Sequence, residues 1–318
     1  MTPAVTPHTN TQQPGHLGTE AALNDALARQ GLPPVAGRRS VAGLNIPSVF
    51  EMLEETAYDL AVLAGEQLIA ALGRPIAVRY QDEHRGIMAP HDAVSDLDEE
   101  IEALLRRRLA VRHPDHAVLG EEGGLGGALG SPFTWTIDAI DGTANFVNGV
   151  PFYASSIGVL LEGVPVAGAV WCSTTHALRP GVYHARHSTQ GGSFHFEGRG
   201  MALAGRQSVG LQRRLSTAPA PHKMREPGWD HRNFGAVGLE SALVAAGVLA
   251  SARTSRSRSW EVAPGVVLVQ AAGHEVWTQG ADRWEPFERF EDPEAWAQPL
   301  LFADEEAVTA LRVGALAL

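Results

Sequence analysis

The stretch FTWTIDAIDGTANF, residues 133–146, decides how the rest of the sequence is interpreted. Its first half is rich in β-branched and aromatic residues and predicts a buried strand, and Asp138 and Asp141 lie where that strand ends. Two carboxylates converge if the chain turns there, and carboxylate oxygens are the ligands that Mg²⁺ prefers. Gly142 allows the backbone to approach an anion closely, and a helix beginning near Thr143 would direct its free N–H groups at a phosphate. Taken alone, this segment is better explained by an Asx turn and a helix cap.

Further acidic residues lie upstream of this stretch. Glu121 and Glu122 follow the apolar residues VLG, which predict a short buried strand, and Asp98 lies in the first turn of a predicted helix. Considered on their own, Glu121 and Glu122 are better explained as solvated loop charges. The hypothesis of a metal site therefore depends on several carboxylates gathering near the ends of neighbouring strands.

The segments before this stretch predict two long helices. Ser48 and Glu51 form a capping box at the start of the first helix, whose apolar residues recur at helical spacing until Gly73. Ser95 is the predicted cap of the second helix, and Pro114 ends it. Both helices are amphipathic, with their apolar residues along one face.

From residue 133 onward the pattern becomes β-rich, and beyond residue 219 helices and strands interleave. This order predicts an α+β or α/β layered sandwich, in which helix and sheet layers alternate. The glycine-rich run GGLGGALG, residues 123–130, does not complete a dinucleotide-binding motif and is predicted to be a flexible loop.

The composition excludes several classes of protein. Of the 318 residues, 44% are hydrophobic, so the chain can build a large core and is not disordered throughout. A net charge of −11 disfavours binding to nucleic acid or to an anionic membrane. The single cysteine, Cys172, cannot form an intrachain disulfide, and no apolar run predicts a membrane helix. With no recognisable secretory signal at the N-terminus, we expect a soluble cytoplasmic protein.

Four ordered motifs resemble those of the inositol monophosphatase family, which belongs to a group of Mg²⁺-dependent, lithium-sensitive phosphatases. They are VSDLD ending at Asp98, GEE at Glu121, WTIDAIDGTANF with Pro151 behind it, and WEVAPG from Trp260. The resemblance covers roughly residues 48–315. It implies a phosphoric monoester hydrolase that acts on a small-molecule phosphate ester, and a homodimer.

The expected domain organisation has three parts. Residues 1–47 are a flexible tail and arm, with a short helix from Thr19 to Gly31. An N-terminal α+β half over residues 48–195 carries most of the metal ligands, and a C-terminal α/β half over residues 196–318 carries the late metal acid and a substrate loop. The site is expected in the cleft between the two halves.

The resemblance implies two or three Mg²⁺ ions, with Mn²⁺ as an alternative. The implied ligands are four carboxylates and one backbone carbonyl, namely Glu121, Asp138, the carbonyl of Ile140, Asp141 and Glu261. Two ions of this kind can activate a water and neutralise the charge on a transferring phosphoryl group.

The resemblance also implies roles for the residues around the metal ligands. Asp98 and Thr143, together with Glu121, would position and deprotonate the attacking water. The backbone N–H groups of Gly142, Thr143 and Ala144 would bind the phosphate.

The sequence departs from the family pattern at two places that bear on function. Glu261 replaces the usual Asp of the late motif, so its carboxylate must retract or shift the metal, and Ala139 replaces the usual Pro. Thr254 stands where the family usually places a sugar-binding Glu. It lies in a basic segment that contains Arg253, Arg256 and Arg258. These arginines predict a second anionic group on the substrate, as in a sugar or nucleotide bisphosphate. A run of solvated surface charges explains them equally well.

One alternative remains open, and two others are disfavoured. A non-catalytic protein that binds phosphate compounds is the main one, because Glu261 puts the second metal site and lithium inhibition in doubt. An aspartyl-phosphate phosphatase is disfavoured because Asp138 and Asp141 are three residues apart rather than two. The spaced histidine pairs His113 and His116, and His184 and His187, lack a third zinc ligand at a recognisable spacing and are interpreted as surface or core residues.

Overall fold

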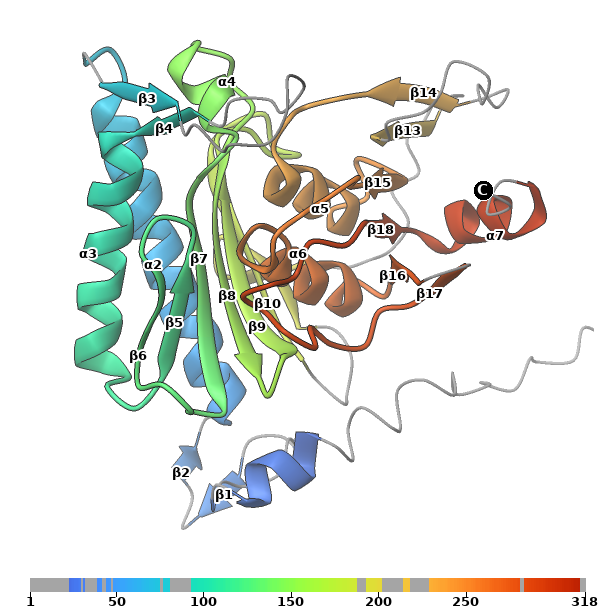
Figure 1. Cartoon of the computed structure of the whole chain (residues 1–318). Helices are drawn as coiled ribbons and strands as arrows, with labels where there is room; N and C mark the ends of the chain where they lie inside the picture. The colour runs from blue at the N-terminus through green and yellow to red at the C-terminus, as the bar shows by residue number, and fades with distance from the viewer. Residues whose placement is uncertain are drawn as a thin grey trace, which may run out of the picture.

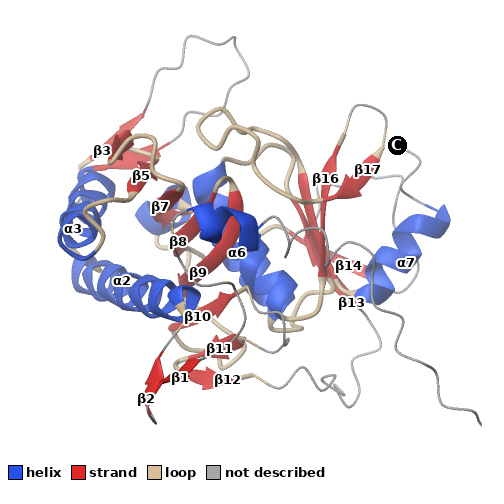
Figure 2. Ribbon diagram, turned by 90° about the horizontal axis from the view of Figure 1, so that it is seen from below, coloured by secondary structure: helices blue, strands red, loops and turns tan. Residues whose placement is uncertain are grey.

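The computed structural model describes residues 23–29, 31, 39–41, 44–46, 48–74, 77–80, 93–187, 193–201, 214–217, 229–280 and 283–314. Within them, helices and sheets alternate in layers (Figure 1). Helices α2 (Val49–Ala71) and α3 (Asp96–Arg112) form the first layer, on one side of an eight-stranded sheet. Helices α5 (Val237–Ala245) and α6 (Ser259–Ala271) pack between this sheet and a six-stranded sheet, which contacts α7 (Glu305–Gly314). Figure 2 shows α6 between strands of both sheets. The predicted layered fold class is therefore confirmed.

Helix α2 begins and ends where the sequence predicts. The Glu51 N–H donates to Ser48 Oγ at 3.2 Å, and the Ser48 N–H donates to the Glu51 carboxylate at 2.9 Å. This capping box satisfies two backbone donors of the helix terminus. After α2, Gly73 adopts a left-handed conformation with φ of 77°, which glycine reaches without steric cost.

The eight-stranded sheet has the order β12-β11-β10-β9-β8-β7-β5-β6. Its strands are β5 (Ala117–Gly120), β6 (Gly124–Gly127), β7 (Phe133–Asp141), β8 (Ala154–Leu161), β9 (Val164–Cys172), β10 (Gly181–Arg186), β11 (Phe194–Phe196) and β12 (Arg199–Gly200). Strands β5 and β7 are parallel, whereas the other neighbouring pairs are antiparallel. Because β5 and β7 run in the same direction, the acid after β5 and the acids at the end of β7 lie at the same edge of the sheet.

Part of the glycine-rich run is a strand and not the predicted flexible loop. Strand β6 pairs with β5 from Ala117 opposite Gly127 to Gly120 opposite Gly124. Helix α3 restricts the start of this run, because a Cβ at Gly123 would lie 2.8 Å from Glu102 Oε1 and 2.9 Å from Arg106 Nε. Part of the glycine-rich run is therefore an edge strand, and the run lacks side chains where α3 packs against it.

The six-stranded sheet has the order β14-β13-β15-β18-β16-β17. Its strands are β13 (Arg214–Thr217), β14 (Trp229–Arg232), β15 (Ser251–Arg253), β16 (Glu275–Gln279), β17 (Trp284–Pro286) and β18 (Leu300–Ala303). Helix α6 approaches the first sheet closely, because a Cβ on Gly168 of β9 would lie 2.7 Å from the Cα of Pro264. The central helices thus share one apolar core with strands of both sheets.

The N-terminal region contains more regular structure than the predicted arm. Residues 23–29 are helical, with Leu23 and Leu27 buried, and β1 (Arg39–Val41) pairs with β2 (Leu44–Ile46) in antiparallel fashion. A second small pair, β3 (Val78–Tyr80) and β4 (Ala93–Ser95), precedes α3. Residues 1–22 of the predicted tail, including the start of the predicted helix at Thr19, lie outside the described residues. Among the described helices, none combines the length and hydrophobicity that crossing a bilayer requires.

Candidate functional site

The end of β7 brings two acids to the same side of the first sheet. Asp138 lies opposite Ser156 of β8, and Asp141 lies opposite Ala154, so β7 has one residue more than β8 over this interval. In a regular strand, side chains three residues apart point to opposite faces, and the extra residue of a bulge removes that opposition. The deciding stretch therefore contains a bulge that aligns Asp138 with Asp141.

Gly142 completes the turn after β7. Its φ of 86° is left-handed, and a Cβ there would lie within 3.2 Å of the backbone oxygens of Gly235 and Phe152. Helix α4 (Thr143–Val147) begins immediately after it, as the sequence predicts. Glycine is thus required at position 142 for both conformation and space.

Helix α6 supplies a third acid from the other half of the chain. One oxygen from each of Asp138, Asp141 and Glu261 lies within 4.8 Å of the others. The Glu261 carboxylate also accepts a hydrogen bond from the N–H of Arg258, at the start of its own helix. The longer side chain is therefore bent back towards the helix N-terminus and still reaches the two aspartates.

The N-terminus of α5 faces Asp141. The Val237 N–H donates to Asp141 Oδ1 at 3.1 Å, and the Gly238 N–H donates to Oδ2 at 2.5 Å. These donors belong to the positive end of a helix dipole, which stabilises a carboxylate. Asp141 thus connects β7 to the central helix layer.

Asp98 and Thr143 form the pair that the sequence analysis expects. Asp98 is buried near the start of α3 and accepts hydrogen bonds from the N–H and Oγ of Ser95, at 2.9 and 2.6 Å. Thr143 Oγ1 lies 3.3 Å from Asp98 Oδ1 and 2.8 Å from the carbonyl oxygen of Ile140, so its single proton is shared between two acceptors. The carbonyl of Ile140 therefore lies beside the same hydroxyl.

Three aspartates of the site have raised pKa values. Desolvation, with the charges of the neighbouring acids, raises the pKa of Asp138 well above its usual range. Desolvation and then the charge of Glu261 raise the pKa of Asp141 to about 8, against the effect of the two helix N–H groups. Desolvation also raises the pKa of Asp98 to about 6, although Ser95 and Thr143 oppose it. Crowded carboxylates of this kind repel one another unless a cation or protons neutralise them.

Glu121 lies at the edge of this group. The Glu121 residue is exposed. Its carboxyl pKa is nevertheless raised to about 8 by desolvation and by the nearby charges of Glu261, Glu122, Asp98 and Asp141. It does not belong to the set of three acids whose oxygens lie within 4.8 Å of one another. The structure therefore brings Glu121 within electrostatic reach of the group and leaves it outside the innermost set.

The residues present fit a hard divalent cation. Asp138 Oδ1 is buried and has no hydrogen-bond partner among the described residues, so its lone pairs are unsatisfied there. Three acids and a nearby backbone carbonyl form an all-oxygen donor set, which suits Mg²⁺ or Mn²⁺ better than a soft metal. A cation bound here would give Asp138 Oδ1 a partner and would also reduce the repulsion between the neighbouring carboxylates.

The three predicted substrate arginines lie in different surroundings. Arg253 of β15 is opposite Leu301 of β18, and its guanidinium lies 5.1 Å from the ring of Trp284. Leu301 and Trp284 belong to the apolar cluster that includes residues of α7, so Arg253 lies beside that cluster. Arg256 is exposed, and Arg258 stacks 5.7 Å from the ring of Trp260 beside Glu261.

Thr254 has a structural role where the family usually has an acid. Its Oγ1 accepts from the Leu300 N–H at 2.8 Å and lies 3.1 Å from Ser257 Oγ. The side chain is buried, so it supports the loop before α6 and presents no charge to a substrate.

A second polar cluster, missed by the sequence analysis, joins α2 to the β10–β11 hairpin. Glu54 is buried, and its Oε1 lies 2.7 Å from His184 Nδ1 and 3.0 Å from His195 Nδ1, while Arg186 pairs with its other oxygen. His184 Nε2 accepts from the Gly198 N–H at 3.2 Å, which assigns the proton to Nδ1 and makes it a donor to Glu54. Hydrogen bonds and an ion pair thus hold this cluster together. His184 pairs with His195, its direct neighbour across the hairpin, and not with His187.

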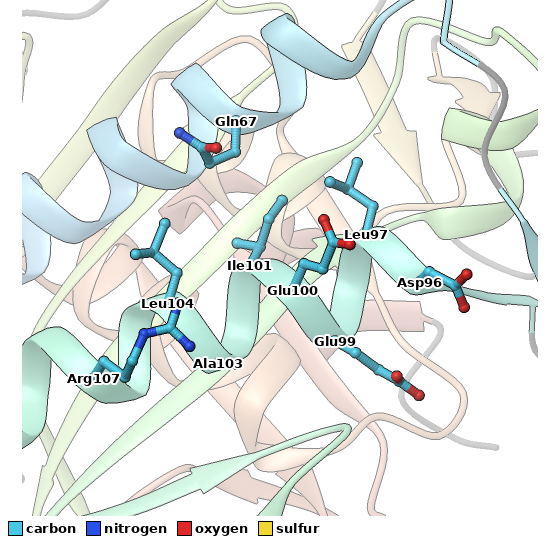
Figure 3. A pocket seen from close by; sticks show the side chains of 9 residues that line it. All are labelled: Gln67, Asp96, Leu97, Glu99, Glu100, Ile101, Ala103, Leu104 and Arg107. Atoms are coloured by element: carbon cyan, nitrogen blue, oxygen red, sulfur yellow. The ribbon is translucent and has the colours of Figure 1, made fainter.

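The described residues also border an open cavity of about 630 Å³ between α2 and α3. Figure 3 shows Gln67 of α2 opposite residues of α3 such as Ile101 and Leu104. None of the carboxylates gathered at the end of β7 lines it, so this cavity is separate from the candidate site.

The comparison with known proteins agrees with this geometry. The profile of the inositol monophosphatase family matches residues 50–295. The inositol-1-monophosphatase of Mycobacterium leprae is 34% identical over 203 residues, covering 59% of this chain and 69% of that protein. A chloroplastic phosphatase of Arabidopsis thaliana is 26% identical over 291 residues, covering 86% of this chain and 73% of that protein.

Solved structures show the same fold. The suppressor protein SuhB of Bartonella henselae gives a TM-score of 0.64 at 23% identity, covering 82% of this chain and 96% of that chain. The inositol monophosphatase of Anabaena gives a TM-score of 0.61 at 20% identity, covering 82% of this chain and 94% of that chain. Because the family match runs from α2 to beyond α6 and includes every acid gathered at the end of β7, the chain belongs to the inositol monophosphatase family and is a phosphatase of small phosphorylated substrates.

Proposed function

We propose that this phosphatase is Mg²⁺-dependent and hydrolyses a phosphomonoester of a small metabolite, resembling inositol monophosphate or a sugar or nucleotide bisphosphate. The observation that carries the proposal is the group of Asp138, Asp141 and Glu261, with the orphaned oxygen of Asp138 inside it. Glu121 and the carbonyl of Ile140 would complete the ligands for two or three ions, with Mn²⁺ as an alternative. When bound, such ions stabilise the charge of the phosphoryl group during its transfer.

The chain's own residues would bind and deprotonate the attacking water. Thr143 Oγ1 can accept a hydrogen bond from a water while it donates to Asp98, whose carboxylate lies 3.3 Å away. With a pKa of about 6, Asp98 is ionised at neutral pH and able to accept a proton. Glu121 would assist from the exposed side. Family resemblance supports phosphate binding by the N–H groups of Gly142, Thr143 and Ala144 at the start of α4.

A panel of phosphate esters tests the proposal. Phosphate release from inositol 1-phosphate, fructose 1,6-bisphosphate, adenosine 3′,5′-bisphosphate and histidinol phosphate would be measured with and without Mg²⁺. We expect Mg²⁺-dependent turnover of at least one ester, and loss of it in Asp138→Asn. Turnover that persists in Asp138→Asn or in a chelator contradicts the proposed metal centre.

The substrate arginines have a test of their own. The double variant Arg256→Ala, Arg258→Ala should raise the KM for a bisphosphate more than the KM for a monophosphate. Arg253→Ala is the matched control.

A non-catalytic protein that binds phosphate compounds is the second candidate, favoured by one observation. The Glu261 carboxylate is hydrogen-bonded to the Arg258 N–H, which leaves fewer of its lone pairs for a metal ion. Metal stoichiometry separates the two functions: two or three bound ions support catalysis, whereas one or none supports the binding protein. Turnover that appears only in Glu261→Asp would favour the second candidate.

The family resemblance also supports a homodimer. Size-exclusion chromatography with light scattering tests it, since a monomeric mass at micromolar concentration would contradict it.

A further inference from the structure

Glu102, which has no assigned role, lies one helical turn after Asp98 in α3. It is 2% exposed, and acids are rarely buried so completely without partners. Its carboxylate accepts three hydrogen bonds: from the N–H of Glu122 at 2.8 Å, from the N–H of Gly123 at 2.9 Å and from Arg106 Nε at 2.7 Å. Two of these donors belong to the turn that immediately follows Glu121.

Arg106 binds the backbone before and after the same turn. Its guanidinium donates to the carbonyl of Val118 in β5 at 3.3 Å and to the carbonyl of Gly124 in β6 at 2.5 Å. The Glu102–Arg106 pair therefore binds backbone N–H groups within the turn and backbone carbonyls on either side of it.

Two glycines of the turn leave space for the Glu102 carboxylate. A Cβ at Gly120 would lie 2.4 Å from the carboxyl carbon of Glu102, and one at Gly123 would lie 2.8 Å from its Oε1. Neither position has room for a side chain while the carboxylate remains in place. Glu121 lies between these two fitted glycines, and its own N–H donates to the carbonyl of Ile137 at 3.3 Å.

We propose that Glu102 is a positioning residue for the metal centre: with Arg106 it fixes the backbone on both sides of Glu121 and so directs that carboxylate at Asp141 and Glu261. This inference rests on the proposed function, in which Glu121 binds a metal ion. Groups that orient metal ligands typically contribute about 10- to 100-fold to metal affinity or activity. Glu102 touches neither substrate nor metal.

Glu102→Gln tests the proposal, because one acceptor oxygen becomes an NH₂ group that faces an N–H donor. We expect the Mg²⁺ concentration for half-maximal activity to rise by about 10-fold or more. The matched control is Glu54→Gln, which alters an equally buried carboxylate with three donors and should leave the Mg²⁺ dependence unchanged. Superimposable Mg²⁺ titrations for Glu102→Gln and the wild type would overturn the proposal.

A second variant and a second readout keep the test decisive. Gly123→Ala should raise the Mg²⁺ requirement in the same direction, since its Cβ displaces the turn while the Glu102 charge is retained. The shift in melting temperature with Mg²⁺ reports metal binding without turnover. If the wild type shows no such shift, the proposed metal centre fails together with this inference. If the wild type and both variants shift equally, the positioning role alone is wrong.

Discussion

At the residue scale, Glu54 shows how a buried acid is kept ionised outside the metal centre. Burial alone would raise its pKa, but hydrogen bonds from His184, His195 and Arg186 outweigh this effect and lower the pKa from 4.5 to about 2. Because the folded-state pKa lies below the unfolded one, the stabilising contribution is complete above pH 4.5 and is lost as the pH falls towards 2. The shift corresponds to about 3 kcal/mol.

This pKa shift predicts how a single substitution changes acid stability. Glu54→Gln should be less stable than the wild type by about 3 kcal/mol at pH 7, and the difference should shrink as the pH approaches 2. Urea unfolding at pH 7, 5 and 3 measures it, with Glu55→Gln, an exposed neighbour on α2, as the control. A difference that stays constant with pH would show that the carboxylate charge is not the cause.

The contacts of a residue could be predicted when its partner lies near it in the sequence. Ser48 with Glu51 was assigned correctly as a capping box, because a helix turn fixes that spacing. Asp138 and Asp141 were correctly expected to converge, although the bulge that aligns them leaves no clear sequence signal. The partners of Glu54 lie across an interface between α2 and a hairpin, and no local spacing encodes that contact.

At the element scale, the placement of α6 controls whether Glu261 reaches the aspartates. Gly168 of β9 leaves room for Pro264 of α6, and Gly65 of α2 lies against Trp171 of the same strand. Each glycine therefore sets the distance of one helix from the first sheet, but only α6 carries a predicted metal ligand.

Adding a methyl group at either glycine should separate these two effects. We expect Gly168→Ala and Gly65→Ala each to cost about 1–3 kcal/mol of stability through overpacking. Only Gly168→Ala should also raise the Mg²⁺ requirement for phosphate release several-fold, because it displaces α6. Denaturant unfolding and Mg²⁺ titration of both variants provide the measurements. Equal Mg²⁺ dependence in the two variants would contradict a link between α6 packing and the metal centre.

Elements with strong caps and apolar periodicity were predicted well, and short or glycine-rich ones were not. Helices α2 and α3 have clear start and stop signals, so their limits could be read from the sequence. Strand β6 has few side chains that could show alternation, and β1 and β2 have three residues each. Their pairing depends on neighbours that the local sequence does not specify.

At the scale of the whole molecule, the carboxylate group joins the first sheet to the central helix layer. A cation bound by Asp138, Asp141 and Glu261 would bridge β7 and α6, so the folded state should gain stability in proportion to metal binding. The alternation of helices and strands predicted these layers, whereas the strand order of each sheet depends on long-range contacts that the sequence pattern leaves open.

Thermal unfolding with increasing Mg²⁺ measures this coupling. At a Mg²⁺ concentration about 100 times the dissociation constant, the stabilisation should reach roughly 2.7 kcal/mol per site. Asp138→Asn should abolish the rise in melting temperature. Without Mg²⁺ it should melt no lower than the wild type, because carboxylate repulsion is relieved. Asp115→Asn, an exposed substitution, is the control. A wild-type melting temperature independent of Mg²⁺ would argue against the bridge.

The position of Glu261 also has a consequence for how the protein is made. Asp138 and Asp141 leave the ribosome more than a hundred residues before α6 is synthesised, and until then the surface of β9 around Gly168 has no helix to cover it. A first sheet that folded before α6 was made would display two crowded acids beside an apolar face without its helix. When α6 packs on the sheet, it covers that face and also brings Glu261 to the two aspartates. The site and the core would therefore be completed in the same step of biosynthesis.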